Sequence, residues 1–167
     1  KNDEDFFVYH SFNWLKVAKE TGGSEIVKLA RDKILTWIKA NHGLRFYLSN
    51  LSLLSKRAIN LIYHYDFYGS TANIKDKSKI KFIIYCHYFF LKNYLENYKE
   101  SSQELIEVKK IVLLYEAIHK LNTSKTINQI KNSLNEDLNS LGLHQSMSPQ
   151  IHAEYINHLI EIKRILL

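Results

Sequence analysis

Glycine and proline are scarce in this chain, with five glycines and one proline among 167 residues. Folds built from short strands need turn residues every 8–12 positions or so, and Gly and Pro supply many of them. A β-sandwich or β-barrel is therefore close to excluded. Hydrophobic residues make up 46% of the chain and charged residues 24%, a composition that can bury a core and does not fit disorder. The sequence predicts an all-α protein.

Apolar residues recur at helical spacing along almost the whole chain. Ile26, Ala30, Ile34 and Trp37, for example, fall on one face of a helix. Seven helices are expected, over residues 5–20, 24–40, 50–65, 77–98, 101–121, 125–141 and 148–167. Their short connections predict antiparallel hairpins in a single α-helical domain covering residues 1–167. The helix over 101–121 is apolar around most of its circumference, so we expect it to be central.

Several classes of function lack the motifs that they need. Glycine-rich phosphate loops, the G-x-S-x-G nucleophile turn and H-E-x-x-H are absent. His152 and His158 are six positions apart, on different faces of a helix, so no metal site or cofactor is expected. The longest apolar stretch, 82–91, is shorter than the roughly 20 residues of a membrane span. The net charge is +6 but no basic helix stands out, so nucleic acid is not an expected partner.

Tyrosines alternate with lysines between residues 63 and 98. Such side chains can stack on sugars or bases. They can equally line the seams between helices with their hydroxyls in water, and we favour this second interpretation for most of them.

Histidine and serine residues gather near the C-terminal end of the chain, in the stretch GLHQSMSPQIHAE over residues 142–154. Ser148 followed by Pro149 is typical of a helix start, with a serine cap and a proline in the first turn. That interpretation does not explain why His144, Ser146 and His152 lie around the same point.

Three stretches resemble the heparinase II/III-like polysaccharide lyases, in the α-helical part that precedes their β-sandwich. The first is SFNWL at 11–15 with WIKAN at 37–41, and the second is KRAINLI at 56–62. The third is the histidine- and serine-bearing segment 142–152. The stretches keep the family's order and span nearly the whole chain.

The resemblance implies an incomplete (α/α) toroid, in which helical hairpins surround a cleft. Its partner would be an acidic polysaccharide, cleaved at a uronate by β-elimination. That reaction needs a neutralised carboxylate, a base for the C5 proton and an acid for the leaving oxygen. A β-sandwich domain following this chain would supply part of the machinery. Because the chain opens at Lys1, we expect it to be a piece of a longer protein. Without the β-sandwich domain, we expect it to be inactive.

The resemblance carries over to particular residues. His144 and His152 match the family's motif histidines and are the expected catalytic residues. Tyr155 lies one helical turn after His152 and is a candidate for a displaced catalytic tyrosine. Arg57 matches the arginine of the third helix, and Arg57 and Ser146 are the residues expected to bind substrate.

The chain departs from the family at three places. Gly142-Leu143 stands where family members often have Asp-Gly just before the motif histidine. Ile151 stands where several members carry a catalytic tyrosine, and Gln103-Glu104 stands where an asparagine–histidine pair is expected. Trp14 and Trp37 match the family's tryptophans and are expected to pack in the core.

Three functions stay open. The chain is the helical domain of a lyase, a non-catalytic module that binds acidic glycans, or a helical module that binds another protein. If either of the first two holds, His144, His152 and Arg57 should face one open cleft.

Overall fold

The computed structural model describes residues 3–41, 50–97 and 103–167. Over these residues the chain is helical and forms no strand, so the predicted all-α class is confirmed. The chain divides into two compact units, Lys1–Phe90 and Leu91–Leu167, and the division falls within helix α6 (Ile74–Asn97). No helix in the described ranges combines the length and apolar character that crossing a membrane requires.

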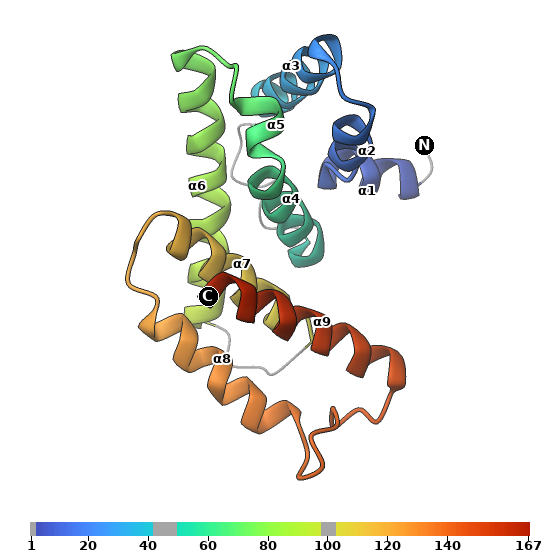
Figure 1. Ribbon diagram of the computed structural model, residues 1–167, viewed down its shortest axis with the longest axis vertical. Coiled ribbons are helices and arrows are strands. Elements are labelled where there is room, and N and C mark those ends of the chain that lie inside the picture. Colours follow the sequence, from blue (N-terminus) through green and yellow to red (C-terminus); the bar gives the residue numbers. More distant parts are fainter. Residues whose placement is uncertain (1–2, 42–49, 98–102) are drawn as a thin grey trace. The chain divides into compact units, whose positions relative to one another are not determined.

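In its described residues, the first unit contains five helices and the first part of α6 (Figure 1). Helix α1 packs on α4, α2 packs on α3, and α5 contacts both α3 and α4. Trp37 is 0% exposed in the core of this unit, as expected, whereas Trp14 is only partly buried. The five helices are α1 (Asp3–Ser11), α2 (Trp14–Thr21), α3 (Ser24–Ala40), α4 (Leu51–Tyr63) and α5 (Tyr65–Gly69).

The single helix expected over 5–20 is divided into α1 and α2 at Phe12. This residue has a φ of 61°, and its buried ring lies 5.2 Å from the ring of Trp37, centroid to centroid. The side-chain amide of Asn60 donates to the carbonyl oxygen of Ser11 at 2.9 Å, an acceptor that a continuous helix would have used. Burial of Phe12 and the bond from α4 therefore outweigh the continuity of the helix.

The helix expected over 50–65 is also divided, at His64. Helix α4 ends at Tyr63, and α5 begins at Tyr65 in a new direction (Figure 1). The hydroxyl of Tyr68 in α5 is fully buried and donates to the carbonyl oxygen of Leu61 at 2.7 Å. This bond holds the turn between the two helices. Helix α6 begins three residues before the expected position 77, and its expected end at 98 lies outside the described residues.

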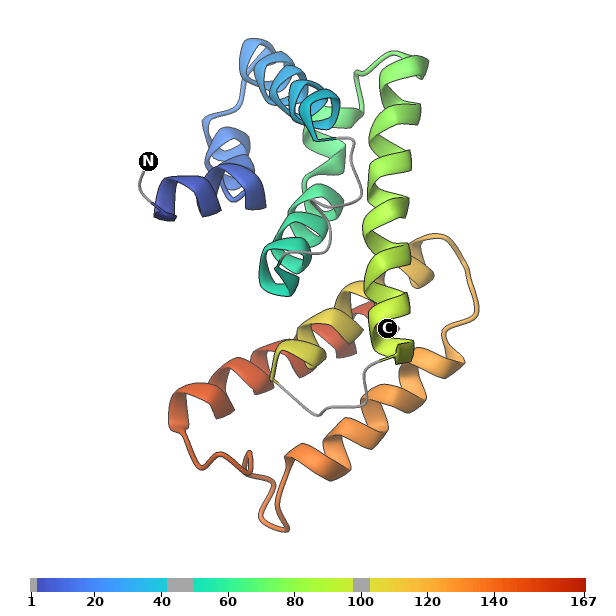
Figure 2. The same cartoon turned by 180° about the vertical axis from the view of Figure 1, so that it is seen from behind.

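Helix α7 (Gln103–Ile118) is the central helix of the second unit, as predicted. It contacts both α8 (Ser124–Asp137) and α9 (Pro149–Leu166), and α9 runs alongside it in Figures 1 and 2. It ends before the expected position 121 because the chain turns at Lys120, which has a φ of 53°. Ile106 and Leu113 of α7 form one buried apolar cluster with Ile130 of α8 and with Tyr155 and Ile162 of α9.

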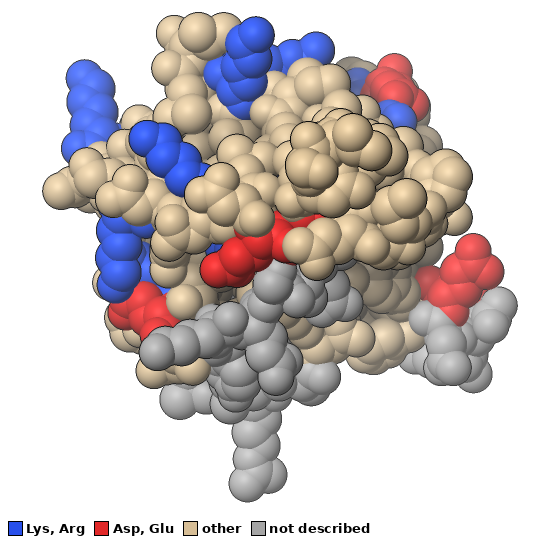
Figure 3. All heavy atoms as spheres, turned by 90° about the horizontal axis from the view of Figure 1, so that it is seen from below, with Lys and Arg blue, Asp and Glu red and all other residues tan. Residues whose placement is uncertain are grey.

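Charged side chains of both signs are set in a mostly uncharged surface on the face drawn in Figure 3.

Candidate functional site

The loop over residues 138–148 carries most of the candidate residues. Helix α8 ends at Asp137, four residues before the expected position 141, and the carbonyl oxygen of Asp137 accepts from the backbone N–H of Gln145 at 2.8 Å. Leu138 forms an isolated antiparallel bridge with His144. The side-chain oxygen of Asn139 accepts from two further backbone N–H groups of the loop. These bonds replace the last helical turn and hold His144 close to the end of α8.

The start of α9 follows the prediction from sequence. Ser148 is the N-cap, and its hydroxyl oxygen accepts from the backbone N–H of Ile151 at 3.4 Å, with Pro149 in the first turn. The hydroxyl oxygen of Ser146 accepts from the backbone N–H of Ser148 at 3.3 Å. The loop and the helix start therefore form one hydrogen-bonded unit around the positive end of the α9 dipole.

His144 and His152 are brought together through the backbone. The N–H of His144 donates to Nδ1 of His152 at 3.2 Å, and the N–H of Ser146 donates to Nδ1 of His144 at 3.1 Å. An Nδ1 that accepts from a backbone N–H carries no proton, so the proton of each neutral ring is on Nε2. Both imidazoles thus carry a donor at Nε2 rather than a lone pair.

A cavity of about 220 Å³ opens at this point of the second unit. Both imidazoles line it, together with the N-cap Ser148 and the apolar side chains of Leu143 and Met147. The complete lining is Leu143, His144, Met147, Ser148, Pro149 and His152. The lining contains no carboxylate, so an occupant with hydrogen-bond acceptors fits it better than one with donors.

Tyr155 does not reach this cavity as a free phenol. Its side chain is 0% exposed, and its hydroxyl donates to Oδ2 of Asp137 at 3.0 Å. Burial, together with the neighbouring Asp137 carboxylate, raises the pKa of Tyr155. The ring contacts that of His144 edge to face, with 5.2 Å between centroids. In this position Tyr155 supports the imidazole of His144 and is unsuited to remove a proton from a bound substrate.

Ser146 and His144 also have the form of a nucleophile and its base. The hydroxyl of Ser146 lies 2.9 Å from Nδ1 of His144, so it donates to the nitrogen that already accepts a backbone N–H. A nucleophilic pair needs a third group that orients the base. Within the described ranges, no carboxylate bonds to the ring of His144. The contact therefore fits a structural turn better than a hydrolytic pair.

Arg57 lies in the first unit, whereas His144 and His152 lie in the second. Its side chain is 1% exposed, its Nε donates to the carbonyl oxygen of His10 at 2.6 Å, and its guanidinium lies 4.5 Å from the Trp37 ring centroid. Substrate binding by Arg57 stays a prediction. The side chains of Gln103-Glu104 lie outside the described part of the chain.

The residue that sequence reasoning missed is Asp137. It accepts from Tyr155 through its side chain and from the loop through its carbonyl oxygen, and it therefore positions both parts of the site. Its place inside an expected helix gave no local signal of this role. No group of three or more His, Cys, Asp or Glu residues in the described ranges could hold a metal ion.

Comparisons with protein-family models, with curated proteins and with solved structures find no match to this chain.

Proposed function

We propose that this chain is the helical domain of a heparinase II/III-like polysaccharide lyase. In this role it binds the carboxylate groups of an acidic polysaccharide in the cavity lined by His144 and His152. The arrangement of its hairpins as an incomplete toroid, and a β-sandwich domain following it, belong to the same proposal. The observation that carries the proposal is the pair His144 and His152, which line one cavity with the proton of each neutral ring on Nε2.

A uronate carboxylate is complementary to such a pocket. Its oxygens accept two to four hydrogen bonds, and the first turn of α9 adds the positive end of a helix dipole. The apolar side chains of Leu143 and Met147 border the same cavity and can contact the faces of a sugar ring. The resemblance of three stretches to the lyases gives the substrate class.

Binding without catalysis is the second candidate function, and two observations favour it for the chain by itself. Ile151 has no exchangeable proton, and the phenol of Tyr155 is buried against Asp137. Removal of the uronate C5 proton would then fall to a residue of the β-sandwich domain. We expect this chain alone to give no ultraviolet absorbance from unsaturated uronate products, and appearance of that absorbance would contradict this assignment.

The proposal is tested by following the histidine ring nitrogens by NMR while a galacturonate tetramer is added. The ring resonances of His144 and His152 should move, whereas the methyl-esterified tetramer should leave them unchanged. His144→Ala and His152→Ala should each weaken binding about tenfold, the size of one hydrogen bond to a charged group.

His119→Ala is the matched control. His119 is an exposed histidine that stacks on Tyr115 at 4.0 Å, centroid to centroid, and it does not line the pocket. This variant should bind the tetramer like the unmodified chain. Equal binding of acid and ester, or binding that survives both pocket variants, would exclude carboxylate recognition at this site.

A further inference from the structure

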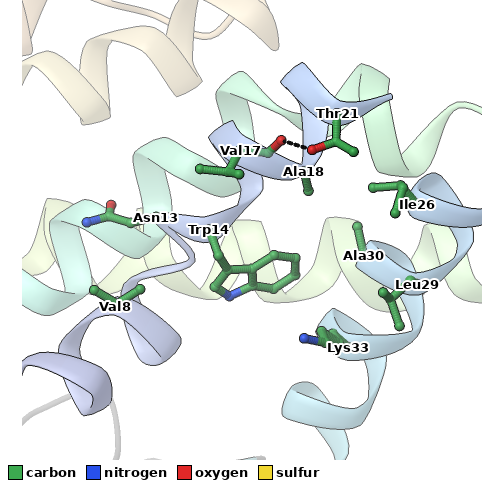
Figure 4. A pocket seen from close by; sticks show the side chains of 10 residues that line it. All are labelled: Val8, Asn13, Trp14, Val17, Ala18, Thr21, Ile26, Leu29, Ala30 and Lys33. Carbon is green, nitrogen blue, oxygen red and sulfur yellow. Dashed lines mark hydrogen bonds between the residues drawn. The ribbon is translucent and has the colours of Figure 1, made fainter. Parts of the chain in front are cut away.

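A second and larger cavity, of about 510 Å³, lies in the first unit between α2 and α3 (Figure 4). The two helices are joined at Gly22 and Gly23, whose φ angles of 69° and 88° fall in the region that favours glycine. This tight connection sets α2 and α3 side by side, and α1 contributes Val8 to the rim of the cavity.

The cavity is lined almost entirely by apolar side chains. Val17 and Leu29 are 63% and 50% exposed although both border it. Ala18 and Ala30 leave room between the helices, and the indole of Trp14 lies in the middle of the group in Figure 4. Volumes of roughly 300–1,000 Å³ with mainly apolar walls are typical of sites for small ligands.

One cation supplies the available charge of this cavity. The ammonium of Lys33 lies 5.6 Å from the ring centroid of Trp14, and Lys33 makes no ion pair within the described ranges. No carboxylate lines the cavity.

The other polar groups of the lining, apart from the amide nitrogen of Asn13, are already engaged. The indole N–H of Trp14 donates to the carbonyl oxygen of Tyr9. The hydroxyl of Thr21 donates to the carbonyl oxygen of Val17. The side-chain oxygen of Asn13 accepts from Asn60. A ligand that enters the cavity therefore meets apolar walls and one positive charge.

We propose that this cavity binds a small carboxylate with an apolar body, such as a medium-chain fatty acid. The hydrocarbon tail of the ligand covers Trp14, Val17 and Leu29, and the carboxylate of the ligand pairs with Lys33 at the rim. Charge complementarity selects this class over neutral apolar molecules, and the absence of an acidic side chain from the lining disfavours cations. The assignment is independent of glycan binding, because it uses residues of the first unit alone.

The test compares octanoate with octanamide, which has the same hydrocarbon tail and carries no charge. Trp14 is half-buried whereas Trp37 is fully buried, so fluorescence emission should shift to shorter wavelength as the ligand excludes water from Trp14. Isothermal titration calorimetry on the same protein gives the affinities. Octanoate should bind several-fold more tightly than octanamide.

Three variants separate charge from apolar contact. Lys33→Gln should weaken octanoate binding by roughly two- to fivefold, as expected for an exposed ion pair, and leave octanamide binding unchanged. Leu29→Asp puts a carboxylate at the mouth of the cavity and should weaken octanoate binding by more than about tenfold. Lys28→Gln, on α3 but outside the lining, is the control and should change neither affinity.

Equal affinities for octanoate and octanamide, or an unchanged octanoate affinity in Lys33→Gln, would overturn the proposal, as would failure of octanoate to bind. A concentration-dependent dimer in sedimentation that Leu29→Asp dissociates would also overturn it, because a second copy of the chain would then be the occupant. Circular dichroism melts of each variant verify that the fold is intact.

Discussion

The hydroxyl of Tyr155 donates to Oδ2 of Asp137 across 3.0 Å, and this bond joins the middle of α9 to the end of α8. Both side chains are buried, and the ring of Tyr155 also contacts that of His144. One tyrosine thereby connects the core of the second unit with the histidine-bearing loop. Its role in this position is structural.

Tyr155→Phe should lower the free energy of unfolding by about 1–2 kcal/mol, because the buried Asp137 carboxylate loses a donor. Urea unfolding followed by circular dichroism measures the change. Tyr85→Phe is the control, since Tyr85 is 46% exposed, and it should change stability by less than about 0.5 kcal/mol. Equal effects of the two substitutions would show that the Asp137 bond contributes nothing net.

Stability should also fall above about pH 10 because of Tyr155. Burial and the Asp137 charge raise its pKa in the folded chain above the ordinary value of 10.0. Above that pH the unfolded chain releases the phenolic proton while the folded chain keeps it, so the free energy of unfolding decreases as pH rises. Tyr155→Phe should reduce this alkaline loss, and an unchanged alkaline profile would contradict the assignment.

His87 should make the fold sensitive to acid. Burial is the main reason that the pKa of His87 is lowered to about 3, and the positive charge of Arg57 is the second reason. The hydrogen bond to the carbonyl of Ile83 opposes the shift. Between pH 6.5 and about 3 the unfolded chain binds a proton that the folded chain does not, so stability falls as pH falls. The slope from this residue approaches about 1.4 kcal/mol per pH unit.

Unfolding midpoints measured from pH 7 to pH 4 in His87→Gln should show a shallower dependence than in the unmodified chain. His119→Gln, at an exposed position, is the control and should keep the original slope. If His87→Gln retained the full acid dependence, another group would be responsible for it.

Glu116 should be the most sensitive charged position of the second unit. It is 1% exposed, its Oε1 accepts from Lys92 Nζ at 2.9 Å, and its Oε2 accepts from the hydroxyl of Thr126 at 2.7 Å. Glu116→Gln turns one acceptor into a donor that faces Lys92 or Thr126. We expect a loss of about 2–3 kcal/mol, near the lower limit for breaking a buried pair because Lys92 is partly exposed.

Glu96→Gln is the matched control for Glu116→Gln. Glu96 pairs with Lys125 at 2.7 Å, but both side chains are well exposed. The control should cost less than about 1 kcal/mol. Thermal unfolding of both variants under one set of conditions gives the comparison, and similar losses would argue against a special role for the buried pair.

Ser148→Ala should lower stability by about 1 kcal/mol, because the first turn of α9 loses its cap. Ser146→Ala removes two hydrogen bonds within an exposed loop, to His144 and to Ser148, and should cost about half as much or less. Chemical unfolding of the two variants ranks them. A larger effect at Ser146 would mean that the loop, rather than the cap, stabilises the start of α9.

Part of the candidate site could be predicted from the sequence. The Ser148 cap depends on residues that are neighbours in the chain, so the local pattern Ser-Pro was enough to place it. The proximity of His144 and His152 was also expected, since both lie within one short segment. The burial of Tyr155 could not be predicted, because its partner Asp137 lies 18 positions away, at the end of another helix.

Periodicity, composition and local capping were enough to predict the helical class, the central place of α7 and the start of α9. The breaks in two expected helices, and the polar groups that remain free to meet a ligand, depend on the packing of the folded chain. Phe12 leaves helical geometry to pack on Trp37, and Tyr155 turns to Asp137. Such choices depend on contacts between residues distant in the chain, whose energies exceed the small local preference for one more helical turn.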